Sequence, residues 1–304
     1  MHVPAGVLRA GLRLSRPIFA SHRISVSTKR KAVDALAGVA RPPRGTTARS
    51  ATVAGVPVEL VEVPESGAGT LLYLHGGGYA LGSAAGYEGV VARLARSAGM
   101  RAVVVDYSRS PEAVFPTALD EVVAVYRALL ADPDRGTVVV AGDSAGGGLS
   151  LAFAMKVRDL GLAPLGAIGL ICPWLDLVAD AEGTRMARRD PLIIPAMLRG
   201  WVGAYTGGLV DPSDPLVSPV RGDLTGLPPV ILHSAQDDPI AADAEALERA
   251  FQDAGLAHRV EHRAWPRRWH CFHLQAGLFR DADEALDHLG AGLARAAERE
   301  HDAS

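Results

Sequence analysis

Residues 137–147 read TVVVAGDSAGG, an apolar run followed by a Gly-x-Ser-x-Gly pattern. The run predicts a buried strand, and the residues after the pattern predict a helix. A sharp strand-to-helix turn would hold the Ser144 hydroxyl clear of the backbone, where bulky side chains at positions 142 and 146 would collide. The short pattern also arises by chance in glycine-rich turns with an idle serine. Its context nevertheless favours Ser144 as a nucleophile, supported by Gly142, Asp143 and Gly146.

Apolar runs and helical patterns alternate on both sides of this turn. We expect a hairpin at 48–63, strands at 70–74, 101–106, 137–141, 167–172, 229–234 and 258–263, and helices at 84–98, 116–131, 147–160, 240–254 and 281–299. Most of these strands are uniformly apolar, which is typical of strands that are buried on both faces of a parallel sheet. The pattern predicts an α/β fold with a mostly parallel central sheet flanked by helices.

Two segments interrupt this alternation. Residues 1–40 read as one or two helices that end before the Pro-Pro and Gly of 41–45. Residues 175–215 contain no strand run but include several large apolar side chains. We interpret the second segment as a helical insertion above the sheet. An additional core-packing helix is the alternative.

A second glycine-rich loop follows the strand at 70–74, where residues 72–79 read LYLHGGGY. Acyl transfer places negative charge on the former carbonyl oxygen, and preorganised backbone N–H groups stabilise that charge. The loop matches the HGGG type found in esterases and lipases. The expected donors are the amides of Gly77, Gly78 and Ala145, with His75 and Gly76 supporting the loop. A phosphate-binding loop is disfavoured because no GK[ST] or GxGxxG pattern follows, and a plain flexible turn is the remaining alternative.

The acid and the base should follow the serine in that order. The loop after the strand at 229–234 offers Asp237 and Asp238, and we favour Asp238, which directly precedes a proline. His270 is the favoured base because it lies nearest the end of the last strand, and His273 is its main rival. The other late histidines are expected to be exposed strand or surface residues: His258, His262 and His288.

Composition limits the remaining classes of function. The chain has 304 residues, a formal net charge of −3 and two cysteines, which form no CxxC pattern. These features give no electrostatic case for nucleic acid and no disulfide or zinc framework. No run of 18 apolar residues is present. We therefore expect a cytoplasmic enzyme without cofactor, metal or integral membrane association.

Several motifs in the same order resemble the hormone-sensitive-lipase family of bacterial esterases, which has the α/β-hydrolase fold. They are HGGGY (75–79), VDYSRSPEAVFPTALDE (105–121), GDSAGG (142–147), PWLDL (173–177), DPLVSP (214–219), QDDP (236–239) and WHCF (269–272). The resemblance implies a catalytic triad of Ser144, Asp238 and His270. It also implies a helical cap made from residues 1–45 and 178–212, with 46–177 and 213–304 as the catalytic domain.

Two departures from the family pattern stand out. The usual Tyr-Arg-Leu-Ala-Pro-Glu is replaced by Tyr-Ser-Arg-Ser-Pro-Glu at 107–112, which shifts a structural arginine to Arg109. Residue 271 is Cys where Gly is common after the histidine. Neither change removes a member of the triad, although the first leaves the salt-bridge geometry of Arg109 open.

The expected function is a serine carboxylesterase that cleaves short- to medium-chain esters through an acyl-enzyme. A lactone hydrolase of the same family is the main alternative, and a non-catalytic ligand receptor on the same fold is a further one that the retained His270 disfavours. The expected partner is a small-molecule ester or lactone, and a homodimer is left open. The candidates for the substrate pocket are Tyr79, Met197, Trp201, Tyr205 and Leu209.

Overall fold

One mostly parallel sheet organises the protein. The computed structural model describes residues 2–64, 66–67, 69–179 and 189–303. In these residues, eight strands pair in the order β1-β2-β4-β3-β5-β6-β7-β8. They are β1 (Thr47–Val53), β2 (Val56–Glu62), β3 (Gly69–Leu74), β4 (Met100–Val105), β5 (Val138–Asp143), β6 (Ile168–Ile171), β7 (Val230–Ala235) and β8 (Val260–Trp265). The β1–β2 and β2–β4 pairs are antiparallel and the rest are parallel, so the predicted fold class is confirmed.

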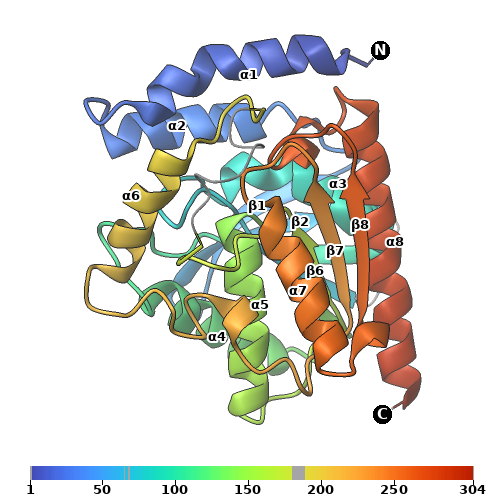
Figure 1. Cartoon of the computed structure of the whole chain (residues 1–304). Coiled ribbons are helices and arrows are strands. Elements are labelled where there is room, and N and C mark those ends of the chain that lie inside the picture. Colours follow the sequence, from blue (N-terminus) through green and yellow to red (C-terminus); the bar gives the residue numbers. More distant parts are fainter. Residues whose placement is uncertain (1, 65, 68, 180–188, 304) are drawn as a thin grey trace.

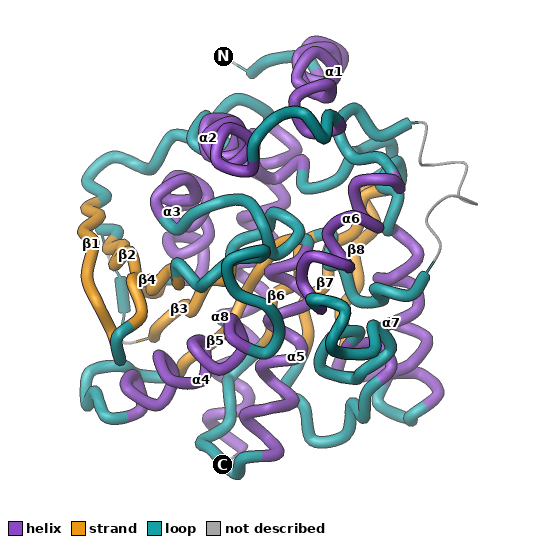
Figure 2. Tube along the Cα trace, turned by 90° about the vertical axis from the view of Figure 1, so that its left-hand side faces the viewer, coloured by secondary structure: helices purple, strands orange, loops and turns teal. Residues whose placement is uncertain are grey.

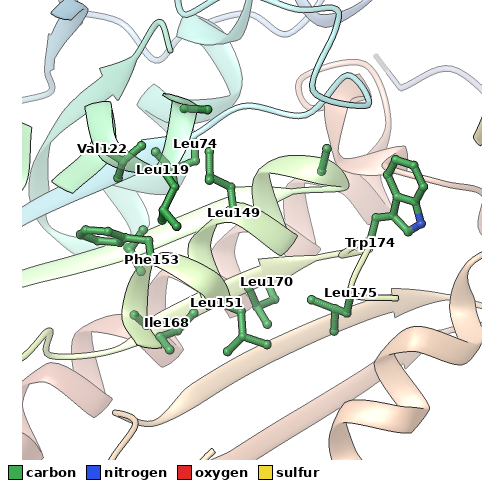
Figure 3. Close-up of a cluster of buried hydrophobic side chains, with 14 of the residues drawn as sticks. Leu74, Leu119, Val122, Leu149, Leu151, Phe153, Ile168, Leu170, Trp174 and Leu175 are labelled. Carbon is green, nitrogen blue, oxygen red and sulfur yellow. The ribbon is translucent and has the colours of Figure 1, made fainter. Parts of the chain in front are cut away.

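Helices cover both faces of the sheet. On one face lie α3 (Glu88–Ala98) and α8 (Arg280–Ala303), and on the other lie α4 (Thr117–Leu130), α5 (Ala145–Asp159) and α7 (Ala241–Asp253). Successive residues of β3 point to opposite faces, so Leu72 and Leu74 join one apolar cluster while Leu71 and Tyr73 join the other. Figure 3 shows the first of these clusters, in which Leu74 lies near side chains from α4 and α5. Burial on both faces explains why the strands are so uniformly apolar.

Local sequence explains where several elements begin and end. The helix α3 ends at Gly99, which has a left-handed φ of 65° that glycine adopts at little cost. The helix α6 (Pro195–Thr206) begins with a proline and ends at Gly207, with φ 61°. Two short 3₁₀ turns account for small boundary differences from the sequence prediction, since η1 (Ala85–Tyr87) precedes α3 and η5 (Ala257–Arg259) precedes β8. Two further turns are η4 (Pro219–Arg221) and η6 (Phe272–Gln275).

Three helices lie beyond the carboxyl ends of the parallel strands. They are α1 (Ala5–Ala20), α2 (Val26–Ala37) and α6, and Figures 1 and 2 show α1 and α2 stacked on the outside of the molecule. The first two are the helices predicted within residues 1–40. Of the expected insertion at 178–212, residues 180–188 lie outside the described residues. The described helices include none that is long and apolar enough to cross a membrane.

Candidate active site

Ser144 lies at the junction between β5 and α5. Its φ of 52° is a left-handed value that non-glycine residues rarely adopt and that often marks a functional turn. A Cβ on Gly142 would lie 2.4 Å from the Gly146 carbonyl oxygen, and one on Gly146 would lie 2.0 Å from the Leu74 carbonyl oxygen. Both distances are far below van der Waals contact, so the steric reason predicted for these glycines is confirmed.

The structure brings Ser144, His270 and Asp238 together in one hydrogen-bonded series. The His270 Nε2 lies 2.9 Å from the Ser144 Oγ, and its Nδ1 lies 2.8 Å from the Asp238 Oδ2. With a neutral imidazole, the serine hydroxyl donates to Nε2 and the Nδ1–H donates to the carboxylate. The second oxygen of Asp238 accepts from the backbone N–H of Ile240 at 2.9 Å. Asp238 is therefore fixed in orientation while it orients the imidazole.

The rival residues have other partners. Asp237 accepts from the Arg9 guanidinium at 2.8 Å, away from the imidazole. His273 is fully buried, and its Nε2 lies 3.2 Å from the Nδ1 of His233. Each rival is thus held by a different contact, and neither joins the series that contains Ser144.

The expectations for the other late histidines need two corrections. His262 is a largely buried strand residue, not an exposed one, because its ring lies 2.8 Å from both Glu248 and Ser234. His288 is not a simple surface group, since its Nδ1 lies 3.0 Å from the Nε2 of His233. His258 is exposed, but it lies in η5 just before the strand.

The glycine-rich loop is held by the residue before the nucleophile. The buried carboxylate of Asp143 accepts from the Gly76 N–H at 2.8 Å and from the Tyr73 and Tyr87 hydroxyls at 3.0 and 3.1 Å. These bonds tie the loop to the nucleophile turn from β5. Gly77 and Gly78, at φ 119° and 62°, follow in the loop and line a cavity with Ser144. The two glycines and the serine therefore face the same cavity.

His75 packs under this loop instead of facing the cavity. Its Nδ1 lies 2.9 Å from the Gly76 carbonyl oxygen, and its ring stacks on Tyr107 with the centroids 4.3 Å apart. Burial lowers the pKa of His75 to about 4, so its imidazole is neutral at physiological pH and its Nδ1–H donates to that carbonyl. These contacts agree with the expected supporting role.

The cavity in front of Ser144 is small and mostly apolar. Its volume is about 80 Å³, and its lining comes from α1, α2, α6 and the loops around His270. Of the predicted pocket residues, Met197 and Trp201 line it. Tyr79 and Tyr205 are buried and stack on each other with ring centroids 3.6 Å apart, outside the lining. Leu209 is 81% exposed, so its assignment to the pocket was wrong.

Comparisons with known proteins agree with this geometry. A sequence profile described as alpha/beta hydrolase fold matches residues 71–274. LipR of Mycobacterium tuberculosis, a candidate acetyl-hydrolase, is 50% identical over 295 residues, which cover 96% of this chain and 95% of that protein. A solved esterase of the bacterial hormone-sensitive lipase family has a TM-score of 0.87 at 30% identity and covers 97% of this chain and 99% of that one.

The chain belongs to the hormone-sensitive lipase family. It is accordingly a carboxylic ester hydrolase with the α/β-hydrolase fold. An acetyl-hydrolase of Streptomyces hygroscopicus is a further relative, 38% identical over 244 residues that cover 80% of this chain and 81% of that protein.

One buried residue beside the triad was not among the residues predicted from the sequence. Asp190 is 1% exposed, and its Oδ2 accepts from the backbone N–H of His270 at 2.8 Å. Its Oδ1 accepts from the N–H groups of Leu192 and Ile193 at 2.8 and 2.6 Å. Burial raises its pKa to about 6. No motif marks Asp190, because its partner lies eighty positions later in the chain.

Arg109, the displaced arginine of the family pattern, contacts the segment that follows the glycine-rich loop. Its guanidinium donates to the carbonyl oxygen of Gly82 and lies 3.4 Å from the Asp106 carboxylate. The Asp106 carboxylate also accepts from the Ala84 N–H at 3.1 Å. The salt bridge of Arg109, which the sequence left open, is therefore formed with Asp106.

Proposed function

We propose that the protein is a serine carboxylesterase that cleaves short-chain esters through an acyl-enzyme on Ser144. The observation that carries this proposal is the hydrogen-bonded series from Asp238 through His270 to Ser144, which opens onto an apolar cavity that Gly77 and Gly78 also line. A serine hydroxyl needs a base to become a good nucleophile, and an imidazole oriented by a carboxylate is such a base.

In the proposed cycle, His270 takes the hydroxyl proton as Ser144 attacks the ester carbonyl carbon. The amides of Gly77, Gly78 and Ala145 stabilise the resulting oxyanion, and one such donor typically contributes about 3 kcal/mol. His270 then protonates the departing alcohol. Water enters, loses a proton to His270 and attacks the acyl-enzyme, which releases the acid and regenerates the hydroxyl.

The protonation state of His270 sets the pH range of this cycle. Burial alone would lower its pKa, but the charge and hydrogen bond of Asp238, with a contribution from Asp190, outweigh burial and raise it. The imidazole must be neutral to accept the serine proton. Activity should therefore rise as pH increases through the His270 pKa, on the alkaline side of the usual histidine range.

The size of the cavity supports a short acyl group. Its volume of about 80 Å³ is small beside the roughly 300–1,000 Å³ of pockets that bind drug-sized ligands. The lining is mostly apolar, which suits an alkyl chain and not a charged acyl group. The names of two relatives as acetyl-hydrolases point the same way.

We also propose that residues 1–45 and 178–212 form a cap that closes this cavity over the catalytic domain, 46–177 and 213–304. Support comes from Leu12 and Phe19 of α1 and from Met197 and Trp201 of α6, which line the cavity together. A cap made of two segments distant in sequence would exclude water from the acyl-enzyme until the alcohol has left.

Turnover of p-nitrophenyl esters tests the proposal directly. We expect hydrolysis of the acetyl and butyryl esters, with an initial burst of p-nitrophenol if deacylation is slow. Ser144→Ala should lower kcat by about a millionfold with an unchanged melting temperature. Activity near that of the wild type in Ser144→Ala, or no turnover of any ester by the wild type, would reject the proposed function. A panel that includes γ- and δ-lactones distinguishes the lactone hydrolase.

A further inference from the structure

The two cysteines of the chain meet at the catalytic histidine. Cys172 directly follows β6, and Cys271 follows His270 and lines the cavity. Both are free thiols and both are buried. The sulfur atoms of Cys172 and Cys271 and one ring nitrogen of His270 lie within 4.8 Å of one another. Among the described residues, this is the one group of three such side chains close enough to share a metal ion.

The spacing of these three atoms is near that of a tetrahedral metal site. Zinc binds thiolate sulfur at about 2.3 Å and imidazole nitrogen at about 2.0–2.1 Å, which places neighbouring ligand atoms about 3.5–3.8 Å apart. The present separations of at most 4.8 Å would need to contract by at most about 1.3 Å. Side-chain rotation of two cysteines can supply a movement of this size without rebuilding the backbone.

The surroundings of the cluster favour a cation. The buried carboxylate of Asp143 and the Asp238 carboxylate both lie close enough to Cys271 to interact with it electrostatically, and Asp190 and Asp238 act on His270 in the same way. When the ion binds, each of the two thiols releases its proton to solvent. The resulting two thiolates with one neutral imidazole form a soft ligand set, which prefers zinc or cadmium to magnesium or calcium. The cavity next to Cys271 leaves a route for the ion and room for a fourth, non-protein ligand.

From this geometry we propose that Cys172, Cys271 and His270 form an inhibitory binding site for a thiophilic divalent cation of the zinc and cadmium class. Each ring nitrogen of His270 already has a hydrogen-bond partner, so the nitrogen that binds the ion loses that partner. Binding through Nε2 displaces the Ser144 hydroxyl, and binding through Nδ1 displaces Asp238. In both cases His270 can no longer act as the base. The expected loss of activity therefore rests on the proposed function, whereas the expected binding of the ion does not.

The backbone conformation of the two cysteines indicates which substitutions the fold should tolerate. Cys172 and Cys271 have φ values of 43° and 49°, in the left-handed region that glycine adopts without strain. Cys172→Gly and Cys271→Gly should therefore fold, and each removes one sulfur ligand. Because the chain has two cysteines, any cadmium–thiolate absorbance must arise from this pair.

The binding experiment titrates the reduced full-length protein with cadmium and follows the ultraviolet thiolate-to-cadmium charge-transfer band. We expect one cadmium per chain, at least a hundredfold weaker binding in Cys271→Gly and Cys172→Gly, and retention of the band in Ser144→Ala. Magnesium should not displace the cadmium. Absence of the band at stoichiometric cadmium, or its persistence in Cys271→Gly, would overturn the site.

The activity experiment asks whether the ion blocks the base. Cadmium or zinc should inhibit hydrolysis of p-nitrophenyl acetate by the wild type, and a chelator should restore the activity. Cys172→Gly, which lies outside the cavity lining, should remain active and be at least a hundredfold less sensitive to the ion. Equal inhibition of both proteins would contradict the proposal. A wild-type protein that binds cadmium but hydrolyses no ester would instead refute the proposed function and leave the metal site intact.

Discussion

At the residue scale, Asp190 joins the proposed cap segment to the loop that carries His270, the proposed base. Its carboxylate accepts from the His270 backbone, and its charge contributes to the raised pKa of that imidazole. Asp190 thus holds the backbone of His270, whereas Asp238 bonds its ring, and Asp190 does not touch the proposed reacting atoms. Its effect on the reaction should therefore be visible in the pH profile as well as in the rate.

Asp190→Asn keeps an acceptor oxygen but removes the negative charge. We expect a fall in kcat/KM of about fivefold, since the loss of one charged acceptor costs about 1 kcal/mol. The acidic limb of the pH–rate profile should move to lower pH, because a charge that raises the His270 pKa is gone. Kinetics between pH 5 and 10 check this. The matched control is Asp211→Asn, in an exposed loop, and an unshifted limb in Asp190→Asn would contradict the role.

Whether a site residue could be predicted depends on how far along the sequence its interaction partners lie. Gly142 and Gly146 were predictable because the constraint on them is a steric one inside a single turn. Asp190 was not, because its bond to His270 joins residues eighty positions apart and exists only in the folded chain. The pairing of Cys172 with Cys271 was hidden for the same reason, since no short spacing in the sequence shows it.

At the element scale, the turn between β5 and α5 depends on close backbone approach to β3. In Gly146→Ala the new methyl would overlap the carbonyl oxygens of Leu74 and His75, at 2.0 and 2.5 Å. We expect the free energy of unfolding to fall by about 3 kcal/mol or more, with loss of activity. Urea denaturation measures this change.

A glycine with free space provides the control for this prediction. Gly203 lies inside α6, and a Cβ there would meet no atom within 4 Å. Gly203→Ala should therefore stabilise the protein by about 0.5–1 kcal/mol through helix propensity. Destabilisation of similar size in the two variants would mean that the tight turn is not the cause.

The helix α6 sets the depth of the proposed acyl pocket. The Trp201 ring packs over Gly78, where a Cβ would lie 2.4 Å from it, and it lines the cavity with Met197. Trp201→Ala should enlarge the cavity, so that longer acyl chains gain about 0.8 kcal/mol for each additional buried methylene. We expect the ratio of kcat/KM for the octanoyl ester over the acetyl ester to rise at least tenfold.

Leu209 supplies the control for this enlargement because it lies beyond the end of α6 and faces solvent. Leu209→Ala should leave the ratio unchanged, and an unchanged ratio in Trp201→Ala would exclude the ring from the acyl pocket. The error over Leu209 has a local cause. The helix ends at Gly207, so the helical spacing that relates positions 197, 201 and 205 does not extend to position 209.

At the scale of the whole molecule, the alternation of buried strands and helices was sufficient to predict a mostly parallel sheet. The order of the strands was not readable, because the crossover that places β3 between β4 and β5 depends on tertiary packing. The same packing buries His273 against His233 on the face covered by α8. These buried imidazoles link the stability of the fold to pH.

Burial and the charge of His270 lower the pKa of His273 from its ordinary value of 6.5 to about 3. Between these two values the unfolded chain binds a proton that the folded chain does not, so acidification destabilises the fold. His273→Gln removes this proton uptake. From pH 7 to pH 5 the wild type should lose about 2 kcal/mol of unfolding free energy relative to His273→Gln. Denaturation at several pH values measures the difference. The control variant His258→Gln, at an exposed position, should show the same pH dependence of unfolding free energy as the wild type. Parallel curves for His273→Gln and the wild type would contradict the prediction, because they would mean that the His273 ring binds protons equally in the folded and unfolded chains.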